Sequence, residues 1–177
     1  MTAATALVVD DEPMVRHLVR RILEPDICDV LEVEDGETAL RLIQRLADSI
    51  DVVLTDLSMP GIDGLTVVEV LAQHQPTLPV LCMSGNVSQF NGPSRPAVPF
   101  IQKPFTPEVL CEAVVALIEQ NRALRARTRQ EGRRASGGRE MSEVLRTRTE
   151  DALAMSVDLV AAARAMQAAR AKARGAG

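Results

Sequence analysis

Short aliphatic runs alternate with amphipathic stretches over the first two thirds of the chain. Apolar, β-branched runs predict buried strands, and apolar residues three or four positions apart predict helices. The expected strands are residues 6–9, 27–33, 52–54, 80–83 and 98–101. Helical spacing follows in Val15, Leu18, Val19 and Ile22, in residues 39–46, in residues 65–71, and from Pro107 onward. Repeated β-α units of this length predict an α/β fold, with a doubly wound five-stranded parallel sheet covered on both faces.

The connection between the fourth and fifth expected strands breaks this pattern. Residues 85–99 contain three prolines and two glycines. Both residue types interrupt helices, so the fourth helix of the fold is expected to be shortened or missing.

Residues with polar chemistry follow the expected strands. In parallel α/β sheets, ligands bind beyond the carboxyl ends of the strands. Asp10 and Asp11 follow the first strand, Asp56 the third, Ser84 the fourth and Lys103 the fifth. Three carboxylates that lie close together repel one another, and a hard cation such as Mg²⁺ relieves that repulsion. Beside such a cation Asp56 could accept a phosphoryl group, with Lys103 and Ser84 contacting the phosphoryl oxygens.

Together these motifs resemble the receiver domains of two-component response regulators, the CheY-like family. The matching segments are VVDDEP (8–13), DG (35–36), LTDLSMPGIDG (54–64), MSG (83–85) and FIQKPF (100–105). The resemblance covers residues 5 to about 121 and implies a flavodoxin-like fold.

The resemblance also implies a reaction and a metal. Asp56 would take a phosphoryl group from a phosphohistidine on a histidine kinase or a histidine phosphotransfer protein. Asp10, Asp11, Asp56 and the backbone carbonyl of Ser58 would hold Mg²⁺ or Mn²⁺. Such a domain is a phospho-acceptor switch rather than an enzyme, although it promotes its own phosphorylation and dephosphorylation, and it signals through protein–protein contacts.

The remaining family positions are assigned in the same way. Ser84 would move toward the phosphoryl group, and Phe100 would turn into the space that Ser84 leaves. Lys103 would bind a phosphoryl oxygen, and its bond to Pro104 is expected to be cis. Other phosphoryl chemistries lack their residues: no GxxxxGK[ST] phosphate loop occurs, and Ser58 stands where a dehalogenase-type phosphatase needs a second Asp.

Composition adds few constraints. Aromatic residues make up 2% of the chain and hydrophobic residues 46%, which predicts an aliphatic core. No apolar run approaches the roughly 20 residues of a membrane span, and the N-terminus lacks a basic region, so a cytoplasmic protein is expected. The three cysteines form no CxxC motif, which argues against zinc.

Charge divides the chain into two parts. Residues 1–121 have 18 acidic and 7 basic side chains, whereas residues 122–177 have 6 acidic and 13 basic ones. We therefore expect a receiver domain over 1–121, a helix continuation and flexible linker over 122–140, and an Ala/Arg-rich helical extension over 141–177. The expected linker sequence is GRRASGG at 132–138.

Two apolar seams in this second part leave alternatives open. The first is Leu110, Val114, Leu117, Asn121, Leu124 and Thr128, which fits a coiled coil, intramolecular pairing or an ordinary helix end. The second is Leu145, Ala152, Leu159 and Met166, which needs a partner and is compatible with self-association. A DNA-binding regulator that uses the basic tail, and a degenerate receiver that acts as a scaffold, are the alternative functions. The tail has no histidine, so it is not a histidine phosphotransfer module.

Overall fold

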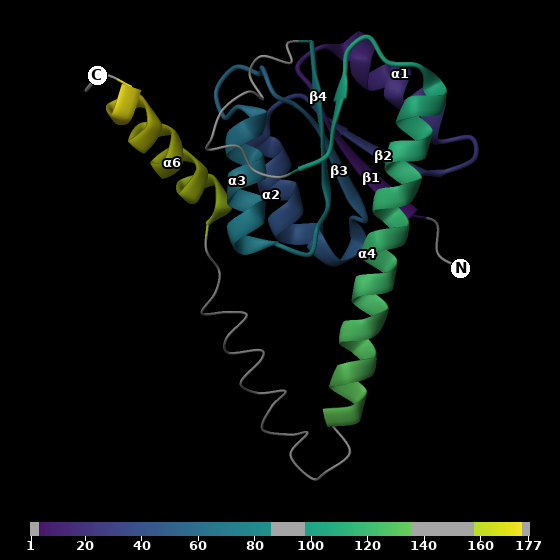
Figure 1. The fold of residues 1–177 in the computed structure, drawn as a ribbon. Coiled ribbons are helices and arrows are strands. Elements are labelled where there is room, and N and C mark those ends of the chain that lie inside the picture. The colour runs from purple at the N-terminus through teal and green to yellow at the C-terminus, as the bar shows by residue number, and fades with distance from the viewer. Residues whose placement is uncertain (1–3, 86–97, 136–157, 175–177) are drawn as a thin grey trace.

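Five parallel strands form the centre of the fold in the computed structural model, which describes residues 4–85, 98–135 and 158–174 (Figure 1). The strands are β1 (Ala4–Val9), β2 (Cys28–Val33), β3 (Val52–Asp56), β4 (Val80–Ser84) and β5 (Phe100–Gln102). The helices are α1 (Pro13–Leu23), α2 (Gly36–Leu46), α3 (Gly64–His74), α4 (Pro107–Ala135) and α6 (Leu159–Arg174), with a short 3-10 helix, η1 (Ala47–Ser49). The strand order is β2-β1-β3-β4-β5, so the predicted flavodoxin-like sheet is confirmed.

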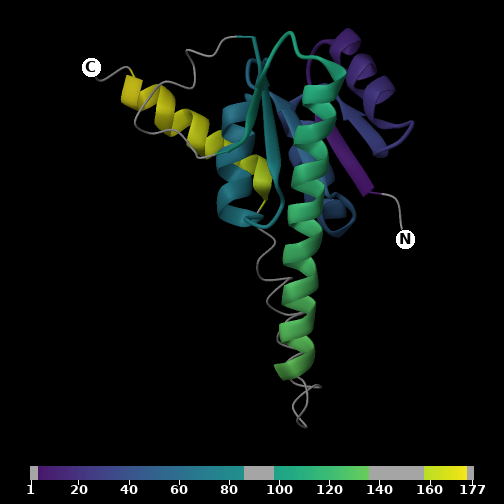
Figure 2. The ribbon, with the colours of Figure 1, turned by 45° about the vertical axis from the view of Figure 1, so that its right-hand side comes forward.

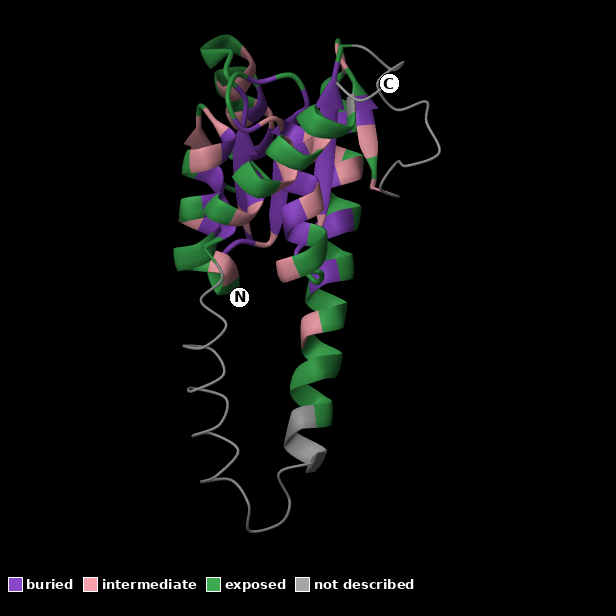
Figure 3. Cartoon of the chain, turned by 90° about the vertical axis from the view of Figure 1, so that its left-hand side faces the viewer, coloured by how far each residue is buried: buried purple, intermediate pink, exposed green. Residues whose placement is uncertain are grey.

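Helices cover both faces of the sheet, because side chains alternate between the faces along each strand. Leu7 and Val9 of β1 belong to the core cluster under α2 and α3. Ala6 and Val8 belong to the cluster under α1 and α4. Strands β1, β3 and β4 are buried almost throughout, as the aliphatic runs predicted, whereas the edge strands β2 and β5 are buried only in part (Figure 3).

Local sequence explains where the helices begin. Asp35 and Asp63 are N-cap residues whose side chains accept hydrogen bonds from the backbone N–H groups of Thr38 (2.7 Å) and Thr66 (2.8 Å). Helix α1 starts instead at Pro13, whose missing N–H costs nothing at a first helical position.

Two element boundaries differ from those predicted. The fifth strand was expected from residue 98, but the ladder begins at Phe100, because Pro99 has no N–H to donate. Helix α4 runs through Gly132, where the linker was expected, and ends at Ala135, since the flanking Arg and Ala residues are good helix formers. The predictions for the fourth helix, at 86–97, and for the extension at 141–157 lie outside the described residues.

The first seam packs within the chain. Leu110, Val114 and Leu117 are buried against the sheet. Asn121 is 1% exposed, and its Nδ2 donates to the carbonyl of Asp51 at 2.6 Å. Of the alternatives, intramolecular pairing is therefore observed as far as Asn121. Arg125 still binds the backbone carbonyls of Ala47, Asp48 and Ile50, and beyond it α4 extends away from the sheet and its helices (Figures 1 and 2).

The described part of the second seam also has a partner within the chain. Helix α6 lies against α2 and α3, on the side away from the sheet (Figures 1 and 2). Leu159 is 3% exposed and belongs to the α2–α3 core cluster, and Met166 packs against that cluster. Leu145 and Ala152 lie outside the described residues.

Candidate functional site

Four strands end at one edge of the sheet and bring the predicted site residues together. The register pairs Val9 of β1 with Thr55 of β3, Asp56 with Met83 of β4, and Ser84 with Gln102 of β5. The strands therefore end almost level with one another.

Lys103 links the two central carboxylates. Its Nζ lies 2.7 Å from Oδ2 of Asp10 and 2.6 Å from Oδ1 of Asp56. Asp10 is completely buried and Asp56 is 6% exposed. Buried charges are tolerated only when they are paired and hydrogen-bonded, and these three groups satisfy one another.

Backbone N–H groups bind the other carboxylate oxygens. The N–H of Glu12 donates to Oδ1 of Asp10 at 3.0 Å, and the N–H of Ser58 donates to Oδ2 of Asp56 at 2.5 Å. Each carboxylate thus has one oxygen bound to the Lys103 ammonium and the other bound to a backbone N–H of the loop that follows its strand. The position of Asp56 is consequently coupled to the conformation of the β3–α3 loop.

Burial and pairing shift two ionisation equilibria. Burial raises the pKa of Asp10, although its hydrogen bonds to Lys103 and to the Glu12 N–H oppose that rise. Burial by itself would lower the pKa of Lys103, but its hydrogen bonds to Asp10 and Asp56 outweigh burial and raise it. The ammonium is therefore held in its charged form at neutral pH.

The other predicted residues occupy different environments. Ser84 is 3% exposed at the end of β4, and Phe100 is half-buried in β5. Asp11 and Ser58 are exposed. The peptide bond between Lys103 and Pro104 is cis.

The donor set is chemically suitable for Mg²⁺ or Mn²⁺, but it is not assembled around a metal. Asp10 and Asp56 supply hard oxygen ligands, and Asp11 is adjacent in sequence. Nevertheless, no three carboxylate, imidazole or thiol groups within residues 4–85, 98–135 and 158–174 form a ready metal cluster. The Lys103 ammonium pairs with the same two carboxylates that a divalent cation would neutralise.

A groove of about 560 Å³ leads to Asp56, and the sequence did not reveal it. Val15 and Leu18 of α1 line it together with Pro104 and Phe105. Leu18 is 49% exposed, although its spacing matched the core face of α1. Periodicity could not distinguish a core position from a groove wall, because both continue the same apolar stripe.

Gly64 marks a close approach between β3 and α3. A Cβ added to Gly64 would lie 1.9 Å from the carbonyl oxygen of Asp56. The first residue of α3 therefore rests directly on the backbone of Asp56.

None of the helices in the described part of the chain is both long and apolar enough to cross a membrane.

Comparison with known proteins gives consistent matches. The response regulator receiver domain family matches residues 6–115. The chain is 36% identical to the positive alginate biosynthesis regulatory protein of Pseudomonas aeruginosa over 120 residues, which cover 66% of this chain and 48% of that protein. It is 32% identical to the transcriptional regulatory protein ResD of Bacillus subtilis over 117 residues, 64% of this chain and 48% of ResD. The chain thus spans less than half the length of these curated relatives.

A solved structure agrees with these matches. The response regulator receiver domain protein from Clostridium thermocellum superimposes with a TM-score of 0.60 and 27% identity. The superposition covers 68% of this chain and 98% of that one. Fold, sequence and the acidic strand ends therefore agree: this chain belongs to the response regulator receiver domain family of two-component systems.

Proposed function

We propose that Asp56 accepts a phosphoryl group from a phosphohistidine of a partner protein and that this modification is the signal. The observation that carries the proposal is the placement of Asp56. Its carboxylate is 9% exposed, lines the groove, and is held by the Lys103 ammonium and the Ser58 N–H. A nucleophile fixed in this way, beside a cation, is what phosphoryl transfer requires of a protein.

In the transfer, an oxygen of Asp56 forms a bond to phosphorus while the bond between phosphorus and the donor's imidazole nitrogen breaks. The electron pair of that bond returns to the imidazole nitrogen, and the product is an acyl phosphate. Lys103 neutralises charge on the phosphoryl oxygens. Ser84, at the end of the adjacent strand, supplies a hydrogen bond, and Phe100 responds by packing.

Asp10, Asp11, Asp56 and the carbonyl of Ser58 would hold Mg²⁺ or Mn²⁺ at this edge. A bound divalent cation would supply charge neutralisation between the carboxylates and the incoming phosphoryl group. The chain's contribution is to bury Asp10 and orient it through the Glu12 N–H.

The rim of the groove suits a protein donor. Leu18 of α1 is 49% exposed and lines the groove together with Phe105, which follows β5. Exposed apolar side chains around a buried nucleophile favour docking of an apolar partner surface. We propose a histidine kinase or a histidine phosphotransfer protein as that partner, with further signalling through protein–protein contacts.

The test is intact-mass spectrometry after incubation with acetyl phosphate and Mg²⁺. The wild-type chain should gain one phosphoryl group, and Asp56→Asn should gain none. Asp51→Asn is a matched control, because Asp51 precedes the same strand at the opposite edge of the sheet and binds the Thr5 N–H. Its adduct should equal that of the wild type. A folded wild-type protein that gains no phosphoryl group from acetyl phosphate or from a phosphorylated histidine kinase would refute the proposal and favour the scaffold alternative.

The DNA-binding alternative has less support. Arg164 and Arg170 of α6 form ion pairs with Glu37, Asp63 and Glu69 of the receiver domain, so part of the basic tail is already neutralised. Binding to duplex DNA that needs residues 122–177 and falls steeply with added salt would favour this alternative.

A further inference from the structure

Helix α6 has the properties of a segment built to dock on the receiver domain. Leu159, Val160 and Ala163 are buried in the α2–α3 core cluster, with Ala163 at 0% exposure. The first turn is capped by Asp158, whose Oδ1 accepts from the N–H of Val160 at 3.0 Å. A helix of 16 residues is marginal alone in water, so its stability depends on this contact.

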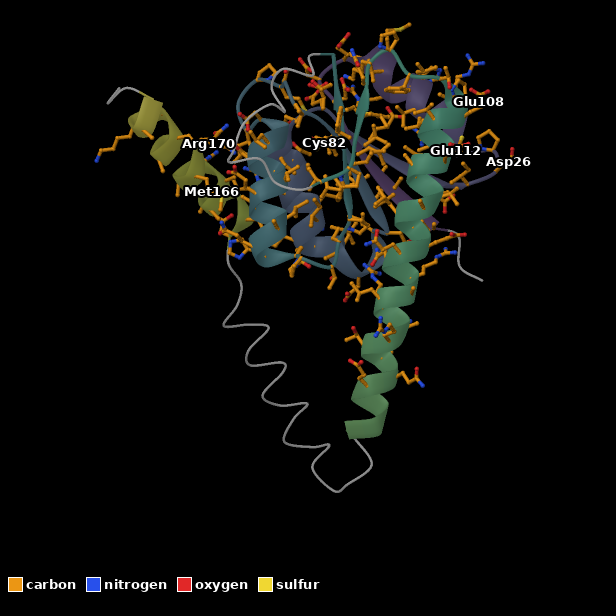
Figure 4. All side chains as sticks on the ribbon, viewed as in Figure 1. Asp26, Cys82, Glu108, Glu112, Met166 and Arg170 are labelled. Carbon is orange, nitrogen blue, oxygen red and sulfur yellow. The ribbon has the colours of Figure 1, made fainter. Side chains whose placement is uncertain are left out.

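Charge complementarity fixes the orientation of α6 on this face. The helix has four basic and no acidic side chains. Arg164 pairs with Glu37 in the first turn of α2 at 2.7 Å. Arg170 pairs with Glu69 of α3, and Figure 4 shows Met166 and Arg170 on the side of α6 that faces the receiver domain.

Two side chains of α6 reach the loop and the helix start that follow the phospho-acceptor residue. Gln167 Nε2 donates to the carbonyl of Gly61 at 2.7 Å. Arg170 lies 3.6 Å from the carboxylate of Asp63 and donates to Oγ1 of Thr66 at 3.2 Å. Asp63 is also the N-cap of α3, so α6 contacts both the turn and the start of the helix after it.

The loop between β3 and α3 also contacts Asp56 itself. The Ser58 N–H binds the Asp56 carboxylate, and Gly64 rests on the Asp56 carbonyl. Gly61 adopts a left-handed conformation, with φ at 74°, between these two points. Residues 56–66 therefore join the phospho-acceptor site directly to the surface that α6 occupies.

We infer that the α2–α3 face is an intramolecular docking site for α6 and that phosphorylation of Asp56 weakens this docking. The inference rests on the proposed function. In the docked structure both Asp56 oxygens are already bound, one by Lys103 and the other by the Ser58 N–H. A phosphoryl group attached to Oδ2 displaces the Ser58 N–H at the start of the loop, so the loop conformation that α6 holds fits the unmodified carboxylate best. By linkage, docked α6 disfavours phosphorylation to the same extent that phosphorylation disfavours docking.

The chain is long enough for docking within one molecule. Residues 136–158 lie between α4 and α6, and that many residues can span about 75–80 Å when extended. The part of α4 beyond Asn121 is only about 21 Å long, so the return is well within reach. Docking in cis predicts that protection of α6 does not depend on protein concentration.

Hydrogen exchange of α6 backbone amides, read by mass spectrometry on the full chain, tests the inference. Acetyl phosphate with Mg²⁺ is added, and phosphoryl incorporation is measured in the same sample. We expect α6 amides to exchange about tenfold faster in the phosphorylated chain, in the middle of the usual range of allosteric couplings. Asp56→Asn with the same additions should show no change.

A matched pair of variants tests the reverse direction. Ala163→Asp places a carboxylate in the buried contact, whereas Ala161→Asp makes the same change on the exposed side of α6. Ala163→Asp should release α6 and raise the phosphorylated fraction several-fold at equal donor concentration, while Ala161→Asp should match the wild type. Gln167→Ala should reduce the coupling and leave α6 protected in the unmodified chain.

The outcomes separate the two proposals. A phosphoryl adduct with unchanged α6 exchange, or equal phosphorylation of Ala163→Asp and Ala161→Asp, overturns the inference alone. If no adduct forms with any donor, the proposed function fails and the inference fails with it. Protection of α6 that rises with protein concentration overturns docking in cis and indicates exchange of α6 between two copies of the chain.

Discussion

Replacing Gly64 by alanine should destabilise the protein more than any other glycine-to-alanine change at a described position. The added Cβ would lie 1.9 Å from the Asp56 carbonyl oxygen and 2.9 Å from Oγ1 of Thr55. Real Cβ contacts stay beyond 3.0 Å, so the start of α3 must move more than 1 Å away from β3. The obstacle is backbone, which cannot rotate aside as a flexible side chain would.

The size of the effect follows from packing. Forcing extra volume into a well-packed interior usually costs about 1–3 kcal/mol. A clash this close with backbone atoms should cost about 3 kcal/mol. Gly61→Ala meets no atom within 4 Å but must hold alanine at a φ of 74°, which costs about 1–2 kcal/mol. Gly85→Ala meets no atom within 4 Å and has no positive φ, so its cost should be near zero.

Urea unfolding of the three variants gives the measurement, with phosphoryl incorporation as a second readout. Gly85→Ala should have the highest unfolding free energy, Gly61→Ala a lower one, and Gly64→Ala the lowest. Gly64→Ala should also take up phosphoryl groups more slowly, because the displaced loop carries Asp56 with it. Equal stability of Gly64→Ala and Gly85→Ala would show that β3 and α3 do not approach each other as described.

Three further predictions concern other contacts. Lys103→Met leaves Asp10 and Asp56 facing each other without an ammonium, so this variant should have an unfolding free energy about 3 kcal/mol lower than the wild type in urea unfolding. In the same assay, added Mg²⁺ should stabilise the variant more than the wild type. Arg125→Met removes three hydrogen bonds to backbone carbonyls and should cost about 2 kcal/mol in the same assay. Burial raises the pKa of the Cys28 thiol to about 11, so stability should be complete below pH 9 and should fall by at most about 2–3 kcal/mol as pH rises from 9 through 11.

Each of these predictions has a control and a contrary outcome. Equal stabilisation of Lys103→Met and the wild type by Mg²⁺ would contradict the view that a cation and the ammonium neutralise the same carboxylates. Arg127→Met, on an exposed turn of the same helix, should change stability by less than about 0.5 kcal/mol. Cys28→Ala should remove the loss of stability at alkaline pH. If the loss stays the same in this variant, other groups cause it.

The strands and the placement of polar residues at their carboxyl ends were predictable because both depend on local signals. An aliphatic run followed at once by Asp or Ser predicts a buried strand with polar chemistry at its end, and a parallel sheet collects such ends at one edge. The salt bridges of Lys103 were not predictable. They depend on how β5 lies relative to β1, with β3 and β4 between them in the sheet, and no local pattern encodes that distance.

The helical seams show a second limit. Leu110, Val114 and Leu117 have the spacing of a coiled coil, yet they pack on the sheet, because a helix needs the same apolar stripe for either partner. In the same way Leu159 and Met166 indicated that α6 needs a partner but not which one. The charges of α2 and α3 identify that partner only once the two helices are placed side by side.

The continuity of α4 has a mechanical consequence. Its 29 residues make a rod of about 43 Å that is held to the receiver domain as far as Arg125, whose guanidinium binds three backbone carbonyls, and about 15 Å of helix follows. Such a rod is a lever: a tilt of about 5° at Arg125 moves Ala135 by about 1.3 Å over that length. The projecting turns thus amplify a small change in the seating of α4, and lengthening or shortening them would scale the displacement in proportion.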